Sequence, residues 1–250
     1  MNGPDQIYFS GDYPDWAEAS AACEVPWTEQ MLEKVLAATL KIRGNEAIEK
    51  GVFRGRVACN FALITALLSA AAKNGNYLSV LDFGGSLGVS YYYSRAFLRD
   101  VSEVKWSIVE LPDLVAAGRR HLESEQLRFH ETIEESIRYH TPTIAVLSGV
   151  LQYLRDPGKT LLDILQIGAP IVFIDRTALI DSDRDRLCIQ HVPESIYRID
   201  LPAWFLSETK LLSTLTDSDY ACLCDFPAID NYALPGARVS FKGFICRRNR

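Results

Sequence analysis

The feature that most constrains this chain is an apolar strand that ends in an acid and runs directly into a glycine-rich turn. The segment reads Val80-Leu81-Asp82-Phe83-Gly84-Gly85-Ser86-Leu87-Gly88, and a helical pattern follows it. A strand, a glycine turn and a helix in this order bind nucleotide-like ligands, because the backbone approaches the ligand closely and the first helical amides point at it. The dinucleotide pattern G-x-G-x-x-G would need glycine at position 83, where the chain has phenylalanine. The run instead fits acid-x-Gly-x-small-x-Gly.

Composition limits the class of protein. The chain has 250 residues, 48% of them apolar, which is enough for one well-packed α/β core. Its net charge of −6 lacks the basic footprint of nucleic-acid binding. The longest apolar stretch, Phe61 to Ala72, is too short to span a bilayer, and the first residues do not resemble a signal peptide. We therefore expect a soluble cytoplasmic protein that binds neither nucleic acid nor membrane.

The cysteines do not indicate a metal site. None of the six forms a C-x-x-C pair, and Cys222 and Cys224, which alternate along an expected strand, have no histidine close to them in sequence. Free cysteine in apolar surroundings behaves as a small buried hydrophobe. We expect structural cysteines and no bound metal.

Strand and helix patterns alternate from Tyr77 onward. Short continuous apolar runs are typical of the buried strands of a parallel sheet. The expected strands are 77–83, 105–110, 126–130, 143–148 and 169–175. The expected helices lie near 88–99, 112–124, 132–139 and 157–167. This alternation predicts a doubly wound α/β sheet with right-handed crossovers.

The last quarter predicts a different arrangement. Ser207–Thr216 has a helical pattern, and Tyr220–Phe226 and Val239–Cys246 have strand patterns. Prolines and a glycine mark the connection between these two strands. We therefore expect a seven-stranded sheet whose last strand is antiparallel.

The N-terminal part has its own character. Residues 1–27 are aromatic-rich and are expected to be irregular, whereas Met31–Gly44 and Val57–Ala71 have helical patterns. We predict an N-terminal aromatic segment and helical cap over 1–75, followed by a ligand-binding core over 76–250.

The glycine run and the terminal antiparallel hairpin resemble those of the class I S-adenosylmethionine-dependent methyltransferases. The resemblance implies a Rossmann-like sheet, S-adenosylmethionine as methyl donor and S-adenosylhomocysteine as product. A closer likeness is to a bacterial methyltransferase family often associated with surface-polysaccharide or secondary-metabolite genes. It is carried by the segments Phe9–Trp16, Asp82–Gly88, Gln190–Tyr197 and Leu201–Phe205. One departure is Ser86, where many class I enzymes have glycine, but serine is small enough to preserve the turn.

Two strand ends are expected to hold the donor. Asp82 could accept a hydrogen bond from the ammonium group of the cofactor, directly or through water. Gly84, Gly85 and Gly88 permit a tight turn and close contact with its amino-acid portion. Glu110 ends the next strand, where a carboxylate can accept hydrogen bonds from both ribose hydroxyls. An acid on both of the first two strands favours a methyl donor over NAD.

Further cofactor contacts follow from position in the same resemblance. Leu111 could pack against the adenine, and Ser148 and Gly149 would run along the methionine part. The adenine amino group could meet Glu131, Thr132 or Glu134, and the sequence does not choose among them. An acid at the start of a helix is as well explained by the helix dipole.

The methyl acceptor is expected on the other side of the cofactor. An insertion over 176–205 follows the fifth strand and commonly shapes the acceptor site in this fold. Aromatic walls with a few polar groups suit a sugar or a planar metabolite. The residues predicted to line the acceptor site are Tyr13, Trp16, Tyr92, Tyr197 and Trp204. The charged run 181–186 is expected to be a solvated or mobile lid.

A hydroxyl acceptor would benefit from a general base. His191 is the best candidate because histidine exchanges protons near neutral pH, and Asp175 is the second. A packing role for His191 is an equal alternative. O-methylation of a sugar or polar metabolite is the favoured function. The alternatives that remain open are N-methylation, a non-catalytic binding protein and an NAD-dependent oxidoreductase. A homo-oligomer is also possible.

Overall fold

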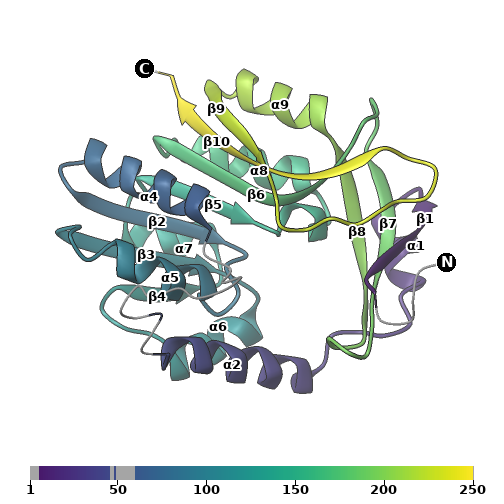
Figure 1. Ribbon diagram of the computed structural model, residues 1–250, viewed down its shortest axis with the longest axis horizontal. Coiled ribbons are helices and arrows are strands. Elements are labelled where there is room, and N and C mark those ends of the chain that lie inside the picture. Colours follow the sequence, from purple (N-terminus) through teal and green to yellow (C-terminus); the bar gives the residue numbers. More distant parts are fainter. Residues whose placement is uncertain (1–5, 46–47, 49–59, 250) are drawn as a thin grey trace. The chain divides into compact units, whose positions relative to one another are not determined.

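The computed structural model (Figure 1) describes residues 6–45, 48 and 60–249. It divides into two compact units. Unit 1 consists of Met1–Met31, Gly149–Ile167 and Ile174–Arg250, and unit 2 of Leu32–Ser148 and Gly168–Phe173. Strand β6 (Ile171–Ile180) belongs to both units. These units differ from the predicted segments 1–75 and 76–250, which remain a prediction about the organisation of the sequence.

Parallel strands form the sheet of unit 2, in the order β5-β2-β3-β4. Their bounds are Tyr77–Phe83 for β2, Glu103–Val109 for β3, Leu127–His130 for β4 and Ile144–Ser148 for β5. The chain passes from β2 outward to β3 and β4, then returns to the other side of β2 to form β5. The strand order therefore reverses beside β2, and ligands of such sheets bind at the carboxyl ends next to this reversal. The predicted parallel βαβ pattern is confirmed.

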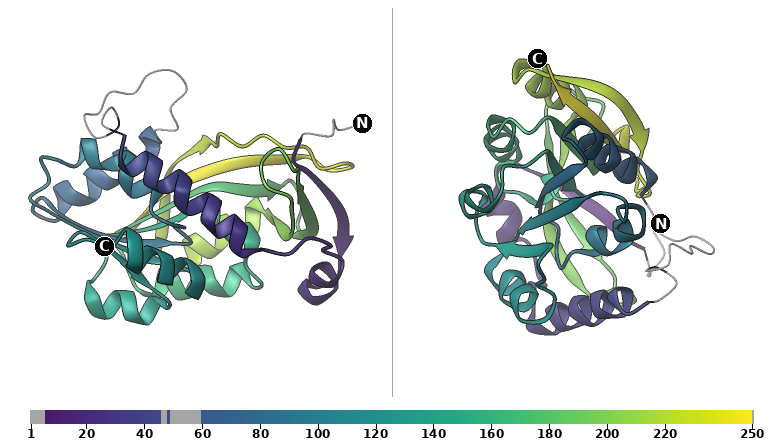
Figure 2. Two further views of the ribbon diagram at one scale, coloured as in Figure 1. Left: turned by 90° about the horizontal axis from the view of Figure 1, so that it is seen from below. Right: turned by 90° about the vertical axis from the view of Figure 1, so that its left-hand side faces the viewer.

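Helices lie on both sides of these strands (Figure 2, right). They are α4 (Phe61–Lys73), α5 (Val89–Ser94), α6 (Pro112–His121) and α7 (Ile133–Tyr139), with a short 3₁₀ turn η1 (Arg95–Phe97) after α5. Side-chain caps explain where two of them begin: Asn60 accepts a hydrogen bond from Leu63 N, and Thr132 accepts one from Glu135 N. The predicted helix from Val57 is confirmed over α4, and its first residues lie outside the described part.

Helix α2 (Glu29–Arg43) confirms the other helix of the predicted cap. Among the helices that the structure describes, none has both the length and the apolar character needed to cross a bilayer.

Unit 1 contains an antiparallel ladder that the sequence patterns did not predict. Strand β1 (Tyr8–Tyr13) pairs with β7 (Arg186–Val192), and β7 pairs with β8 (Ile199–Ser207). Helix α1 (Trp16–Ala21) follows β1. The expectation that residues 1–27 are irregular is therefore wrong. Strand β1 is short, and a bulge at Gly11 (φ 87°) interrupts the alternation that would have indicated a strand.

The insertion over 176–205 contains β7 and most of β8. Proline is disfavoured in a strand that is paired on both sides, because it has no N–H to donate. Pro202 nevertheless lies in β8, opposite Ile189 of β7. Strand β8 pairs with β6 at Leu206 and Ser207, beyond the proline.

The charged run 181–186 comprises the turn between β6 and β7 and the first residue of β7, and it has defined partners. Asp181 N donates to Arg238 O. Arg184 forms a two-bond ion pair with Asp12, and Arg186 donates to Gly11 O. The run is largely solvated, as expected, but it is also tied to β1 and to the segment before β10.

The C-terminal part of unit 1 confirms an antiparallel last strand. Helix α8 (Pro157–Gln166), helix α9 (Glu208–Asp217), β9 (Tyr220–Pro227) and β10 (Val239–Arg248) complete it, together with a 3₁₀ turn η2 (Leu151–Tyr153). Strand β10 runs antiparallel to β9. The described residues form ten strands, so the predicted count of seven is wrong. The additional strands are β1, β7 and β8.

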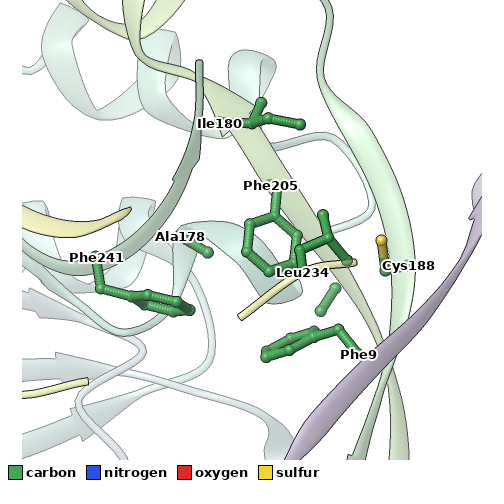
Figure 3. Close-up of a cluster of buried hydrophobic side chains, with 8 residues drawn as sticks. Phe9, Ala178, Ile180, Cys188, Phe205, Leu234 and Phe241 are labelled. Carbon is green, nitrogen blue, oxygen red and sulfur yellow. The ribbon is translucent and has the colours of Figure 1, made fainter. Parts of the chain in front are cut away.

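A cluster of apolar side chains joins three distant segments of unit 1 (Figure 3). Phe9 comes from β1, Phe205 from β8 and Phe241 from β10. The rings of Phe9 and Phe205 meet edge to face with centroids 4.9 Å apart, and those of Phe205 and Phe241 are 6.0 Å apart. The cluster gives the N-terminal strand an apolar anchor.

Removing the central ring of this cluster should destabilise the protein strongly. Phe205 is fully buried, so Phe205→Ala should lower the free energy of unfolding by about 3 to 5 kcal/mol. Ile229 is 77% exposed, and Ile229→Ala should change it by less than about 0.5 kcal/mol. Urea unfolding of both variants measures the difference. Similar losses in the two variants would contradict the packing described.

Candidate functional site

The turn after β2 has the backbone conformation that its glycines predict. Gly84, Ser86 and Gly88 have φ angles of 71°, 51° and 86°. This left-handed region is easy for glycine but costs a serine free energy. Gly84 N donates to Val109 O at 2.9 Å, which joins the turn to the end of β3. Helix α5 begins immediately after Gly88.

Asp82 lies directly beneath this turn. Its side chain is buried, at 1% exposure, and its Oδ2 accepts a hydrogen bond from Trp106 Nε1 at 2.9 Å. A Cβ atom on Gly85 would lie 2.5 Å from the carboxyl group, so a side chain at this position would displace Asp82. The Asp82 carboxyl group thus occupies the space next to Gly85 in the turn.

Burial changes the acidity of Asp82. Loss of hydration raises the pKa of Asp82 to about 7, with the Trp106 hydrogen bond lowering it in part and the nearby charge of Glu110 raising it. The carboxyl group therefore exchanges its proton near neutral pH. A cationic group placed close to it would favour the ionised form.

Glu110 accepts hydrogen bonds from the turn after β2 and from the turn after β3. Its Oε1 accepts from Ser86 N at 3.0 Å and its Oε2 from Leu111 N at 2.8 Å. Burial raises the pKa of Glu110, and these two amide hydrogen bonds lower it. A carboxylate has about four lone-pair positions, so two remain for a ligand. The arrangement can accept two hydroxyl groups side by side.

The other predicted cofactor residues surround this pair or follow β5. Leu111 is 67% exposed, which leaves an apolar side chain open beside Glu110. Ser148 is half-buried at the end of β5, two residues beyond Val146, which pairs with Asp82. Gly149 begins the adjoining segment of unit 1 with φ 66° and donates to Asp175 O at 2.8 Å.

The three predicted candidates for the adenine contact follow the end of β4, and the structure adds a fourth. Thr132 caps α7, and Glu131 N donates to Glu135 Oε2, so the helix-start explanation describes this segment. The sequence patterns missed His130, whose buried Nε2 has no hydrogen-bond partner among the described residues. Burial lowers the pKa of His130. Its position as the last residue of β4 was the available signal.

Trp106 was also missed. It lies within β3 opposite Val80, and it reaches Asp82 diagonally across the two strands. A tryptophan in a buried strand usually needs an acceptor for its indole N–H. That need was the available signal, but the partner could be named only with the strand register.

Tyr92 was predicted to line the acceptor site, but its ring is buried at 4% exposure. It packs edge to face against Tyr91, and the guanidinium carbon of Arg95 lies 6.0 Å from its ring centre. These contacts pack Tyr92 within unit 2, and its contact with the acceptor stays a prediction.

His191 belongs to unit 1, where it has two hydrogen-bond partners. Its Nε2 lies 2.8 Å from Ser10 Oγ, and its Nδ1 lies 2.8 Å from Asp200 Oδ1. The ring also stacks on Tyr8, with centroids 4.5 Å apart. Neither Ser10 nor Asp200 was predicted. Ser10 is remote from His191 in sequence, and Asp200 belongs to no recognisable motif.

The remaining acceptor candidates also lie in unit 1. Trp204 Nε1 donates to Leu154 O at 3.1 Å, and Tyr197 packs beside the apolar cluster of Met31, Val192 and Ile199. Tyr13 covers Gly11, and Trp16 is half-buried at the start of α1.

Asp175, the second base candidate, is 3% exposed. Its Oδ1 would lie 2.8 Å from a Cβ atom on Gly243, so strand β10 covers it closely.

No cluster of three or more potential metal ligands occurs within the described residues. Cys23, Cys188, Cys222, Cys224 and Cys246 are free thiols. The expected absence of metal therefore stays a prediction for the protein as a whole.

No protein-family model matches the sequence, and no curated protein is detectably similar to it. Several solved structures are similar to this chain at low sequence identity. The N-terminal domain of EvdMO1 with SAH bound is 15% identical, with 74% of this chain and 81% of that chain covered and a TM-score of 0.47. The 1,6-didemethyltoxoflavin-N1-methyltransferase of Burkholderia thailandensis, with 1,6-didemethyltoxoflavin and S-adenosylhomocysteine bound, is 17% identical over 97% and 100%, with a TM-score of 0.43.

The glycopeptide N-methyltransferase MtfA is 14% identical over 73% of this chain and 94% of that chain, with a TM-score of 0.43. Similarity at this level transfers neither a ligand nor an activity to this chain. The functional inference therefore rests on the residues around Asp82 and Glu110.

Asp82 should make the protein less stable as the pH rises toward neutral. Its pKa of about 7 in the folded state exceeds the ordinary value of 3.8, so between these values the folded state keeps a proton that the unfolded state has lost. The free energy of unfolding should therefore decrease from about pH 4 to about pH 7, by on the order of 4 kcal/mol.

Asp82→Asn keeps an acceptor for Trp106 but cannot ionise, so it should lack this component. Urea unfolding of both proteins across that pH range measures the difference. A difference in stability between wild type and variant that does not change with pH would contradict the raised pKa.

Proposed function

We propose that this protein is an S-adenosylmethionine-dependent methyltransferase that acts on a small molecule. The observation that carries the proposal is the Glu110 carboxylate. Both of its oxygens are fixed by backbone amides of the two turns, which sets the carboxylate in place before any ligand arrives. A pair of vicinal ribose hydroxyls matches the two lone pairs that remain.

The turn after β2 suits the other end of the donor. Gly84 and Gly88 adopt the left-handed backbone conformation. The Asp82 carboxyl group occupies the space that a side chain on Gly85 would need. A ligand can therefore approach the backbone of the turn closely. In its ionised form Asp82 supplies a negative charge beneath the turn, which favours a ligand that carries an ammonium group.

This pair of acids favours a methyl donor over NAD. A dinucleotide site normally uses an acid after the second strand and glycine at the position of Phe83. Here the first strand also ends in an acid, and its buried carboxyl group would be unfavourable next to a pyrophosphate. The bound donor would supply an electrophilic methyl group, and the residues named here would hold and orient it.

We propose O-methylation of a sugar or another polar metabolite, with N-methylation as the alternative. Tyr13, Trp16, Tyr197 and Trp204 stay predictions for acceptor contacts. His191 stays the predicted base, and its Nε2 would have to exchange Ser10 for the acceptor hydroxyl. Asp175 is the weaker candidate because it is almost fully buried.

Calorimetry with S-adenosylhomocysteine tests the donor. We expect it to bind the wild-type protein and NAD not to bind. Glu110→Gln should weaken binding about 10- to 100-fold, because it removes charged hydrogen bonds to the ribose. Glu103→Gln is a matched control, since Glu103 is exposed at the other end of the same strand, and its affinity should equal that of the wild type.

The opposite pattern, with NAD bound and no response to S-adenosylhomocysteine, would overturn the proposal. A panel of hydroxyl and amine metabolites incubated with S-adenosylmethionine then separates the remaining classes. Product from hydroxyl compounds indicates O-methylation and product from amines N-methylation. Donor binding without turnover on any member would favour a non-catalytic binding protein.

Binding of S-adenosylhomocysteine should also release protons near pH 7. Asp82 is partly protonated there because its pKa is about 7, and the ammonium group of the ligand would lower that pKa. Affinity should therefore increase as the pH rises from about 6 to about 8. Calorimetry in buffers of different ionisation enthalpy measures the release. Asp82→Asn should abolish it, and equal release from this variant would assign the protons to another group.

A further inference from the structure

We propose that Ser10, His191 and Asp200 form a second reactive centre, in which the Ser10 hydroxyl is a nucleophile toward acyl and phosphonyl groups. This activity goes beyond methyl transfer and does not depend on it. All three residues belong to unit 1, and none of them is among the residues proposed to hold the methyl donor. His191 is also the predicted base for methyl transfer, but the activity proposed here needs no methyl donor.

The three side chains form one continuous chain of hydrogen bonds. Ser10 Oγ lies 2.8 Å from His191 Nε2, and His191 Nδ1 lies 2.8 Å from Asp200 Oδ1. An activated nucleophile is recognised by this geometry: a hydroxyl within reach of a base, and a third group that orients the base. The roles depend on position in space, so the order of the residues in the sequence is immaterial.

Asp200 is itself held in place, which sets the proton positions on the ring. Its Oδ2 accepts from Glu24 N at 3.0 Å, and its own amide donates to Val25 O at 3.0 Å. A carboxylate beside Nδ1 favours the proton on that nitrogen. The lone pair of the neutral ring is then on Nε2, directed at Ser10, so the hydroxyl donates and the imidazole accepts.

The β-ladder places the three groups on one face. His191 pairs with Tyr8 of β1 and with Asp200 of β8. Ser10 is two residues beyond Tyr8 and therefore points to the same side. Stacking of Tyr8 on the imidazole, at 4.5 Å, further limits rotation of the ring. The arrangement is built on strands, and it does not need a flexible loop to assemble.

A bulge follows the serine immediately. Gly11 has φ 87°, and the register of β1 against β7 shifts between Ser10 and Tyr13. The Gly11 carbonyl is fixed by Arg186, whose Nε and Nη2 donate to it at 3.2 and 2.8 Å. Bulges of this kind redirect a side chain and are common beside active sites. Here Ser10 is the last residue of β1 before the register shift, where it is still paired with Ile189.

Access distinguishes this chain from a buried structural network. Ser10 is exposed, and the His191 side chain retains 24% of its exposure. Asp200, which needs no contact with a substrate, retains 13%. The hydroxyl can therefore meet an electrophile from solvent, while the orienting carboxylate is shielded.

The reaction we propose is acyl transfer from a small ester. Ser10 Oγ forms a bond to the carbonyl carbon and its proton passes to His191 Nε2, while Asp200 stabilises the resulting imidazolium. The ester's alkoxide leaves and takes that proton, which gives an acyl-serine and an alcohol. Water then attacks the acyl group with His191 as base, releases the carboxylic acid and restores the serine.

An alkyl fluorophosphonate tests the nucleophile without a known substrate. Ser10 Oγ would attack phosphorus, fluoride would leave, and the hydroxyl proton would pass to His191. We expect a single adduct on the full-length protein, assigned to Ser10 by peptide mass spectrometry. Ser10→Ala should abolish it, and His191→Gln should slow labelling about 100-fold, the usual contribution of a general base. Asp200→Asn should slow it as well, because an amide favours the other tautomer.

Ser182→Ala provides the matched control. Ser182 lies in unit 1, and its hydroxyl accepts a hydrogen bond from Arg184 N, but it has no histidine partner in the structure. Its labelling should equal that of the wild type. Thermal melting of each variant identifies any loss due to unfolding, and Asp200→Asn replaces His191→Gln if the latter does not fold. Absence of an adduct on wild-type Ser10, or labelling of Ser10 at the same rate in folded His191→Gln and Asp200→Asn, would overturn the proposal.

Discussion

The proposed cofactor site depends on the hydrogen bonds that join the turn after β2 to the end of β3. Glu110 accepts hydrogen bonds from backbone amides of both turns, and Gly84 N donates to the last carbonyl of β3. These bonds fix the two strand ends in addition to the parallel ladder and the Trp106–Asp82 hydrogen bond. Because the switch in strand order lies beside β2, the same bonds also shape the edge at which such sheets bind ligands.

Asp82 completes this arrangement from inside the sheet. A buried carboxyl group normally costs stability unless it is hydrogen-bonded, and Trp106 supplies one bond. The remaining cost appears as a raised pKa. Gly85 allows the turn to close over the carboxyl group. Asp82 therefore affects both the stability of the fold and the charge of the proposed cofactor site. Functional sites often contain residues that lower stability in this way.

Much of unit 2 could be predicted from sequence because its signals are local. Continuous apolar runs marked β2, β5 and β6, and the acids and glycines at two strand ends marked the site. Trp106 and His130 were missed because their significance depends on strand register and on burial. The ladder in unit 1 was missed for a related reason: β1 has few residues and a bulge, and it is a strand only because β7 provides the hydrogen-bonding edge. The contacts of His191 with Ser10 and Asp200 follow from that ladder and could not be found before it.

The pairing of β1 with β7 has a consequence for how the chain folds. Ser10 and His191 are 181 positions apart, and closing so long a loop is entropically unfavourable until the intervening segments are compact. Strand β1 is therefore synthesised long before the strands with which it pairs. During translation its aromatic side chains stay without these partners until β7 and β8 have left the ribosome, so the Ser10–His191–Asp200 arrangement forms only after β8 has been synthesised.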